Sequence, residues 1–433
     1  MIEGVTILTG DCRTVLADLP ERSVSCCITS PPYFSLRDYG TEPLVWGDGW
    51  RGQLGLEPDP RQYVAHLVEC FDAVWRVLRD DGTMWVVLGD SFARDRSKGQ
   101  HGPGQSGKQA RVYDSGGGRA SAGITLKEGG LKAKNRLFVP HRVAMALQER
   151  GWICRIDVAW EKSNALTESV KDRPSVSHEY VFLFSKRERY YFDHAAVRQP
   201  HTGKPKNAGY KGREDGRGER AGMHNHKGRA AHEDAYHPLG RNLRSVWSIP
   251  HGSYQQGHFA VMPLALVELC IKASTSEWGA CAECGAPWRR VEAKGEPDRE
   301  WQKASGGDGL GQYEGQAVKA YEGAKAQNAS DVKRRILAGM TAKITTGWEP
   351  ICRCGTTARR PCLLLDPFAG SGTVGVAAKR LRREAVLIDV KPEYVKLSEE
   401  RCDPIRVEGE RVGQLSLETV WKGEEVGKRP ASK

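Results

Sequence analysis

A serine, two prolines and a tyrosine, Ser30–Tyr33, directly follow the short apolar run Val24–Ile28. The run has the length of a buried strand, and proline fixes its own backbone angle and has no N–H to give to a sheet. Pro31 and Pro32 therefore end the strand abruptly and leave a hydroxyl and an aromatic ring at its carboxyl end. A turn that merely ends a strand has the same pattern, so a function here depends on the rest of the chain.

A second turn of chemical interest lies in the segment LLLDPFAGSGTVGVAAKRL, residues 363–381. The pattern predicts a strand, a tight turn and a helix, in which Gly370 and Gly372 let the backbone approach a ligand near the free N–H groups of the helix start. Nineteen residues after Gly370, Asp389 ends another apolar run, where a carboxylate can accept hydrogen bonds from ribose hydroxyls. The spacing predicts a nucleoside site. It does not fit a Walker loop, and a dehydrogenase would leave the Ser30–Tyr33 segment unexplained.

Two close cysteine pairs have the spacing of metal ligands. They are Cys281 with Cys284, and Cys352 with Cys354, and 67 residues separate the pairs. Four thiolates suit tetrahedral zinc, and a filled coordination sphere indicates a structural site rather than a catalytic one. The alternative is a set of free thiols, since C-x-C is less common than C-x-x-C and the separation is long for a zinc finger.

The elements that must position these residues are short apolar runs alternating with amphipathic stretches. Strands alternating with helices predict an α/β fold, a doubly wound and mostly parallel sheet of seven strands covered on both faces. The predicted strands are Val5–Leu8, Val24–Ile28, Met84–Leu88, Ile153–Trp160, Tyr180–Phe184, Leu363–Leu365 and Val386–Ile388. The predicted helices are Tyr63–Leu78, His141–Arg150, Met262–Lys272 and Thr373–Leu381.

Composition narrows the class of protein. The 433 residues carry a net charge of +11, and the excess is concentrated in two glycine-rich stretches, 94–136 and 198–245. Basic loops of this kind favour a polyanionic partner, nucleic acid before membrane. No apolar run approaches the roughly 18 residues of a membrane span, and the N-terminus has no signal-peptide pattern, so we expect a soluble, cytoplasmic protein without a membrane partner. Its twelve cysteines are then thiols or metal ligands rather than disulfides.

Together, TSPPY and DPFAGSG resemble the amino-directed DNA methyltransferases that use S-adenosylmethionine. The order, with the SPPY tetrapeptide first and the glycine turn near the C-terminus, resembles the circularly permuted β class. Segments 158–193 and 245–275 also resemble the family, so the likeness covers roughly half the chain. It implies a site-specific methylase of double-stranded DNA, bacterial or phage-encoded, within a restriction–modification system or acting alone. In the first case a cognate restriction endonuclease would act separately.

The chemistry of such an enzyme gives the tetrapeptide a role. An exocyclic amino nitrogen is a poor nucleophile, so acceptors must draw its N–H groups out of plane as it attacks the methyl group. Ser30 offers a hydroxyl oxygen, Pro31 a carbonyl that Pro32 holds rigidly, and Tyr33 a ring on which a flipped base can stack. In the family, serine at the first position is commoner among cytosine-N4 than among adenine-N6 enzymes, which favours cytosine without excluding adenine.

The resemblance also implies which residues contact the cofactor. Asp366, Phe368, Gly370 and Gly372 match the cofactor loop, Asp389 the ribose contact and Asp11 a contact to the adenine edge. His258 and Phe259 open the segment expected near the methionine moiety. For His258, a helix-capping surface role is an equal alternative.

These inferences predict how the chain is divided. The catalytic half contains basic loop 94–136, and the zinc pairs lie in an inserted lobe. The ranges are 1–193 for the catalytic half, 194–250 for a DNA target-recognition insertion, 251–280 and 355–410 for the cofactor-binding half, 281–354 for the inserted lobe and 411–433 for a tail.

Three other functions fit parts of the sequence less well. Carbon-5 cytosine methylases use a Pro-Cys nucleophile, and Pro361–Cys362 is such a pair, but Cys362 leads into the strand that ends at Asp366. RNA or protein-glutamine methylases carry related tetrapeptides with the cofactor loop first, so the order here counts against them. The third alternative is a zinc-bearing nucleic-acid-binding module that has lost catalysis. The intact Ser30–Tyr33 and Gly370–Gly372 turns argue against it.

Overall fold

The computed structural model describes residues 4–93, 131–165, 167–200, 240–251, 261–297 and 341–403. The chain divides into two compact units. The large unit comprises Met1–Asp193, Arg244–Arg289 and Pro350–Lys433, and the second unit comprises His194–Leu243 and Arg290–Glu349. The predicted basic stretches lie mostly outside the described residues.

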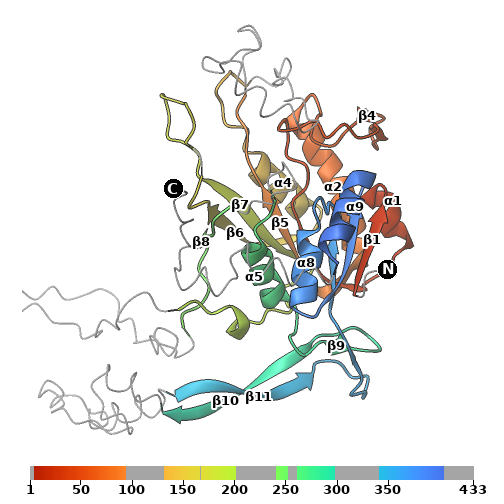
Figure 1. Ribbon diagram of the computed structural model, residues 1–433, viewed down its shortest axis with the longest axis vertical. Coiled ribbons are helices and arrows are strands. Elements are labelled where there is room, and N and C mark those ends of the chain that lie inside the picture. The colour runs from red at the N-terminus through yellow and green to blue at the C-terminus, as the bar shows by residue number, and fades with distance from the viewer. Residues whose placement is uncertain are drawn as a thin grey trace, which may run out of the picture. The chain divides into compact units, whose positions relative to one another are not determined.

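The large unit is built on an eight-stranded sheet with the order β1-β14-β13-β2-β5-β7-β6-β8 (Figure 1). Neighbouring strands are parallel except where β7 lies antiparallel between β5 and β6. The strands are β1 (Val5–Thr9), β2 (Val24–Thr29), β5 (Leu78–Leu88), β6 (Ile153–Glu161), β7 (His178–Ser185), β8 (Val246–Ser248), β13 (Leu363–Asp366) and β14 (Glu384–Asp389).

This arrangement confirms the predicted doubly wound, mostly parallel sheet and each of its seven predicted strands. The eighth strand, β8, was not predicted. It has only three residues, and its pairing with β6, where Trp247 lies opposite Trp160, makes it a strand. Such a short run has no periodicity that could distinguish it from a loop.

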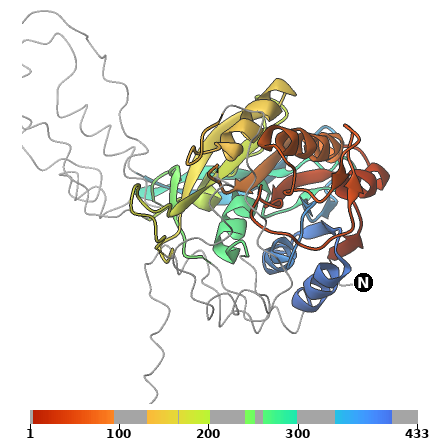
Figure 2. The same cartoon turned by 90° about the horizontal axis from the view of Figure 1, so that it is seen from above.

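Helices cover both faces of the sheet (Figure 2). Helices α5, α8 and α9 lie on one face, and α2 and α4 on the other. The helices of the large unit are α1 (Cys12–Val15), α2 (Pro60–Val77), α4 (Val139–Glu149), α5 (Leu264–Ser274), α8 (Thr373–Arg380) and α9 (Pro392–Arg401). The four predicted helices correspond to α2, α4, α5 and α8.

Local sequence explains where these helices begin and what they bury. Helix α2 starts at Pro60, and the carboxylate of Asp59 accepts a hydrogen bond of 2.7 Å from the backbone N–H of Arg61, so one free donor of the first turn is satisfied. Helix α5 is apolar almost all round because it packs between the sheet and α8. Its one acidic side chain, Glu268, is buried and pairs with Arg380 of α8 at 3.3 Å.

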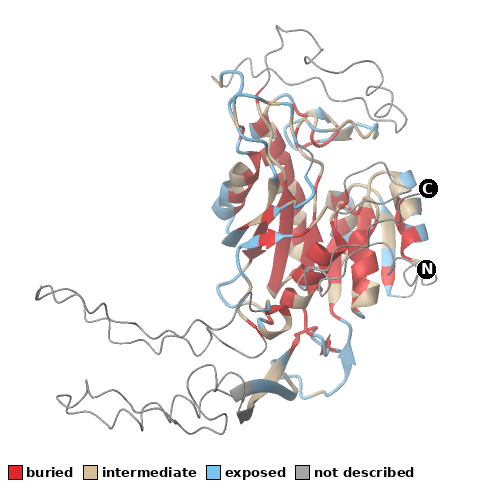
Figure 3. Cartoon of the chain, turned by 60° about the vertical axis from the view of Figure 1, so that its left-hand side comes forward, coloured by how far each residue is buried: buried red, intermediate tan, exposed pale blue. Residues whose placement is uncertain are grey.

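The buried residues gather on the central strands and on the helices that pack against them (Figure 3). All six residues of β2 are buried, as expected for a parallel strand covered on both faces. A continuous core therefore holds the carboxyl ends of β2, β13 and β14 in fixed relation to one another.

Small two-stranded sheets complete the described residues. In the large unit these are β3 (Leu44–Val45) with β4 (Arg51–Gly52), and β9 (Ala280–Cys281) with β12 (Arg359–Arg360). The second unit contains the ribbon of β10 (Trp288–Pro297) and β11 (Thr341–Pro350) and a bridge between Gln199 and Arg241. Among the described residues, no helix is long and apolar enough to cross a membrane.

Candidate active site

The two turns singled out in the sequence lie side by side at one edge of the sheet. β2 and β13 are parallel neighbours, so Ser30 follows one strand and Pro367 the other at the same end. The hydroxyl of Thr29 donates a hydrogen bond of 2.7 Å to Oδ1 of Asp366, across 337 positions of sequence. Strand pairing and this bond fix the relative position of the two turns.

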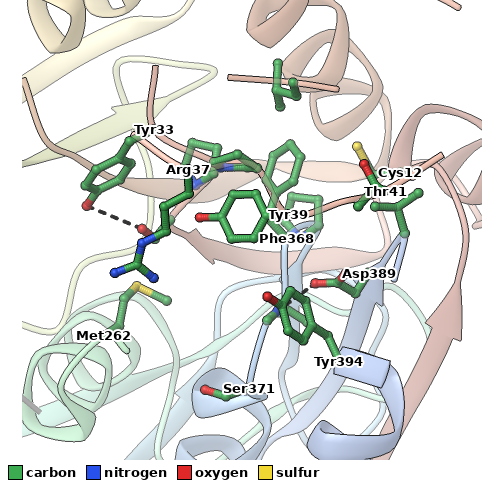
Figure 4. A pocket seen from close by; sticks show the side chains of 18 of the residues that line it. Cys12, Tyr33, Arg37, Tyr39, Thr41, Met262, Phe368, Ser371, Asp389 and Tyr394 are labelled. Atoms are coloured by element: carbon green, nitrogen blue, oxygen red, sulfur yellow. Dashed lines mark hydrogen bonds between the residues drawn. The ribbon is translucent and has the colours of Figure 1, made fainter. Parts of the chain in front are cut away.

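A pocket of about 230 Å³ lies between the turns (Figure 4). Its lining includes Ser30, Pro31, Pro32 and Tyr33 from the first turn, Phe368 and Gly370 from the second, and Asp11 and Asp389 from the ends of β1 and β14. In Figure 4, Tyr33, Arg37 and Met262 lie on one side of the pocket and Asp389 and Tyr394 on the other. Eight of the predicted site residues therefore share one cavity.

The backbone of the SPPY turn leaves the carbonyl of Pro31 available. The carbonyl of Pro32 accepts a hydrogen bond of 2.7 Å from the hydroxyl of the buried Tyr63, whereas none of the described residues donates to the carbonyl of Pro31. The ring of Tyr33 packs against Gly89, where any Cβ would lie 2.7 Å from the ring. The turn is thus held rigidly, and the Pro31 carbonyl remains free to accept a hydrogen bond.

The glycine turn is held by Asp389. The backbone N–H of Gly370 donates to Oδ2 of Asp389 at 2.8 Å, and that of Lys391 donates to Oδ1 at 2.9 Å. Burial raises the pKa of Asp389 to about 6, and the two amide donors partly oppose this shift. Gly370 has a φ of 52°, in the left-handed region that favours glycine. Each carboxylate oxygen keeps a lone pair for a ligand.

Two of the predicted cofactor residues do not line the pocket. Gly372 lies beneath it as the N-cap of α8, with a φ of 76°. Asp366 is fully buried, its Oδ1 also accepts the backbone N–H of Phe368 at 3.1 Å, and Oδ2 has no hydrogen-bond partner among the described residues. Burial raises the pKa of Asp366 to about 7. Through these bonds to Thr29 and Phe368, Asp366 connects the two turns inside the protein core.

The remaining predicted positions are placed as follows. Asp11 lines the pocket and caps α1 by accepting the backbone N–H of Arg13 at 2.9 Å, and its carboxylate pairs with the Arg13 side chain at 2.6 Å. His258 and Phe259 lie outside the described residues, although the nearby Met262 lines the pocket. Cys362 is buried at the start of β13, the far end of that strand from the pocket, so a carbon-5 nucleophile at this position is not supported.

Several lining residues were missed by sequence reasoning. On the side of Asp389, Tyr39 and Tyr394 meet edge to face at 6.3 Å between ring centres, and Lys391 donates to the carbonyl of Tyr39 at 2.7 Å. On the side of Tyr33, the pocket is lined by Trp160, Lys162, Glu179 and His251 from β6, β7 and the segment after β8.

The glycine turn also continues to Gly375, whose missing side chain allows close packing on Leu387 and Cys402. The spacing Gly370-x-Gly372-x-x-Gly375 was a sequence signal that could have identified Gly375. The aromatic and charged lining residues belong to no motif that could have identified them.

The four paired cysteines meet away from this pocket. The Sγ atoms of Cys281, Cys284, Cys352 and Cys354 all lie within 4.8 Å of one another. The pairing of β9 with β12, which sets Cys281 opposite Arg359, brings the two segments together. Backbone N–H groups of Cys284 and Glu283 donate to the Cys281 thiol and lower its pKa to about 7. The donor set and spacing fit one zinc ion.

Comparison with known proteins agrees with this geometry. The family model described as DNA methylase, of the N6/N4 type, matches residues 24–282 and 359–400. The Type II methyltransferase M.XycI of Xanthomonas campestris pv. cyanopsidis is 31% identical over 401 residues, covering 93% of this chain and 88% of that protein. M.Cfr9I of Citrobacter freundii is 30% identical over 400 residues, covering 92% of this chain and 88% of that protein.

Among solved structures, the PvuII DNA methyltransferase, described as cytosine-N4-specific, aligns with a TM-score of 0.46 at 17% identity, covering 98% of this chain and 95% of that one. The family assignment rests on the sequence matches, which span most of the chain. The chain belongs to the S-adenosylmethionine-dependent DNA amino-methyltransferases of the N6/N4 family.

Proposed function

We propose that this enzyme methylates the exocyclic amino nitrogen of a flipped base in double-stranded DNA, with cytosine N4 favoured over adenine N6. The observation that carries the proposal is the convergence of the SPPY turn and the glycine turn on one pocket. One turn supplies acceptors for an amino group, and the other supplies a cradle for a nucleoside.

The acceptors act on the amino group as it becomes nucleophilic. The hydroxyl oxygen of Ser30 and the free carbonyl of Pro31 face the same pocket and can accept the two N–H groups of the base. As the nitrogen attacks, its positive charge develops next to these fixed dipoles. Preorganised acceptors of this kind lower the barrier without reorganising. The ring of Tyr33 offers a stacking face to the extruded base.

S-adenosylmethionine supplies an electrophilic methyl group on a sulfonium ion. The residues on the other side of the pocket fit its nucleoside part. Asp389 retains lone pairs for ribose hydroxyls, Phe368 offers an aromatic face, and Asp11 lies where it can reach the adenine edge. Gly370 keeps its backbone open, because no atom lies within 4 Å of the position that a Cβ would occupy. His258 and Phe259 remain predictions for the methionine end.

The preference for cytosine rests on Ser30. A neutral hydroxyl suits the amino group of cytosine without placing a formal charge beside it, and the family resemblance implies the same preference. Adenine N6 is the alternative.

The test is a methylation assay with duplex DNA and methyl-labelled cofactor, followed by digestion to nucleosides. We expect N4-methylcytosine as the labelled product. Ser30→Ala should lower kcat by about a hundredfold with unchanged cofactor affinity, since one preorganised acceptor is lost. Ser23→Ala is the matched control, because Ser23 precedes the opposite end of β2, where its hydroxyl donates to the carbonyl of Pro20 at 2.7 Å. N6-methyladenine as product would refute the base preference, and full activity of Ser30→Ala would remove Ser30 from the mechanism.

Three further assignments are proposals of the same kind. We propose that Cys281, Cys284, Cys352 and Cys354 bind one structural zinc ion, with no open coordination position for chemistry. Residues 194–250 are proposed as the target-recognition insertion, whose basic side chains would contact DNA phosphates and base edges. A cognate restriction endonuclease acting separately remains a prediction from the resemblance.

A further inference from the structure

A chain of polar groups runs away from Ser30 on the side of the pocket opposite Asp389. The hydroxyl of Tyr33 donates a hydrogen bond of 2.8 Å to Oε2 of Glu179, and Lys162 forms an ion pair with Oε1 of the same carboxylate. The hydroxyl of Ser30 lies 3.4 Å from that of Tyr33, a long contact in which Ser30 is the donor. Glu179 and Lys162 lie on β7 and just after β6, at the same edge of the sheet as the SPPY turn.

The direction of each hydrogen bond along this chain follows from the protons available. A tyrosine hydroxyl carries one proton, and here it is donated to a carboxylate that can only accept. The Tyr33 oxygen is therefore left as an acceptor for Ser30, and the long contact of 3.4 Å runs from the Ser30 hydroxyl to Tyr33. With its proton directed to Tyr33, Ser30 keeps its lone pairs for other partners, and Ser30 lines the pocket. Burial and the nearby charge of Glu179 raise the pKa of Tyr33 well above its ordinary value, so the hydroxyl keeps its proton.

Lys162 and Trp160 hold the far end of the chain. The ammonium group of Lys162 offsets the charge of Glu179, which would otherwise be costly for a carboxylate with only 17% of its side chain exposed. Lys162 also lies 5.0 Å from the ring centre of Trp160, whose indole N–H donates to the carbonyl of Ile249 at 2.8 Å. Trp160 is 2% exposed and its position is fixed. Glu179 is thereby held at a defined place behind Tyr33.

We propose that Glu179, fixed by Lys162, is a positioning residue that orients the hydroxyl groups of Tyr33 and Ser30 so that Ser30 Oγ faces the target amino group as an acceptor. This inference rests on the proposed function. It adds that the hydroxyl of Tyr33, and not only its ring, contributes to turnover. It also makes Glu179 and Lys162, which lie outside both sequence motifs, necessary for the full rate of methyl transfer.

The test is a double-mutant cycle measured with saturating DNA and cofactor. Tyr33→Phe and Glu179→Gln should each lower kcat by about ten- to a hundredfold, as expected when an acceptor is misoriented, with KM for both substrates nearly unchanged. Thermal stability should stay nearly unchanged in Tyr33→Phe and fall in Glu179→Gln, where Lys162 loses the charge of its partner. In a Ser30→Ala background each change should have little further effect, because the group that it orients is gone. Glu161→Gln, at an exposed position at the end of β6, is the matched control and should keep wild-type kcat.

Additive losses in the cycle would overturn the proposal, since Glu179 would then act independently of Ser30. Wild-type kcat in Tyr33→Phe would also overturn it, and this variant removes a single oxygen, so it gives an answer even where Glu179→Gln fails to fold. Failure of the proposed function is distinguishable, because wild-type enzyme would then yield no methylated amino group at all.

Discussion

Two aspartates end neighbouring strands at the pocket, and their surroundings give them different properties. Asp389 lines the cavity and accepts two backbone N–H groups, one on each oxygen, so it remains a strong acceptor for a ligand. Asp366 is enclosed by protein, and both of its donors bind the same oxygen. Two carboxyl groups of the same kind thus differ, Asp389 at the pocket and Asp366 enclosed in the scaffold, because burial and donor placement differ.

Asp366 should make the enzyme less stable as pH rises. Burial raises its pKa from 3.8 to about 7, so the unfolded chain releases this proton near pH 4 while the folded protein retains it up to about pH 7. The free energy of unfolding therefore falls across that window, by up to ~4 kcal/mol at about 1.4 kcal/mol per pH unit, and is flat above it. Asp366→Asn keeps a carbonyl oxygen for Thr29 and Phe368 and carries no proton to lose. Urea unfolding at pH 4.5 and 7.5 should show a smaller fall in the free energy of unfolding for Asp366→Asn than for wild type.

Comparison of wild type with Asp366→Asn isolates the contribution of Asp366. Asp389, with its pKa raised to about 6, contributes to the pH dependence of the free energy of unfolding in both proteins. An identical pH dependence in wild type and Asp366→Asn would show that this carboxyl is not the titrating group.

At the scale of elements, the start of α8 shows how the cofactor turn is built. Gly372 caps the helix with a φ of 76°, and the hydroxyl of Ser398 on α9 donates to the carbonyl of Gly370 at 2.9 Å. A Cβ at Gly372 would lie 2.9 Å from the side chain of Ser398 and 3.1 Å from its Cα. Helix α9 therefore supports the turn so closely that only glycine fits.

Gly372→Ala should destabilise the protein and weaken cofactor binding. The left-handed conformation alone costs about 1–2 kcal/mol for a residue with a Cβ, and the contact with the Ser398 backbone adds to this because α9 must move. Gly49→Ala is the matched control: Gly49 has a φ of 81° and nothing within 4 Å of its Cβ position. Urea unfolding should show a clearly larger loss at Gly372. Equal losses at the two sites would mean that α9 yields freely and does not constrain the turn.

At the scale of the whole molecule, the cysteine cluster joins segments that the sequence separates. Cys281 and Cys284 precede β10, and Cys352 and Cys354 follow β11, yet all four thiols converge. Arg79 at the start of β5 donates to the backbone carbonyl of Cys284, so the cluster is also attached to the main sheet. A metal here would close the chain between the two pairs into a loop.

Purified protein should contain about one zinc ion per chain by elemental analysis, as a tetrahedral four-thiolate site requires. Cys281→Ser should lose the metal and lower the melting temperature, and a chelator should destabilise the wild type in the same direction. Cys154→Ser, a partly exposed thiol on β6 outside the cluster, should retain full zinc content. Metal-free wild-type protein with an unchanged melting temperature would show that the four cysteines are free thiols.

The sequence by itself determined the class of fold, both turns and the family. Short, largely apolar runs such as Val24–Ile28 have the length and composition of strands covered on both faces, and proline and glycine mark where the strands end. These signals are local, so seven strands and four helices could be assigned from them. The sequence placed Ser30 and Gly370 each just after the carboxyl end of a predicted strand.

Only the tertiary structure decided what surrounds those turns. The contact between Tyr33 and Glu179, the placement of Asp366 beneath the pocket, and the three-residue strand β8 depend on strand register and packing between distant segments. Residue spacing carries no information about such contacts, because one step of register would point Glu179 to the other face of the sheet. Local patterns thus determined where the chemistry could take place, and packing of distant segments determined which neighbours orient it.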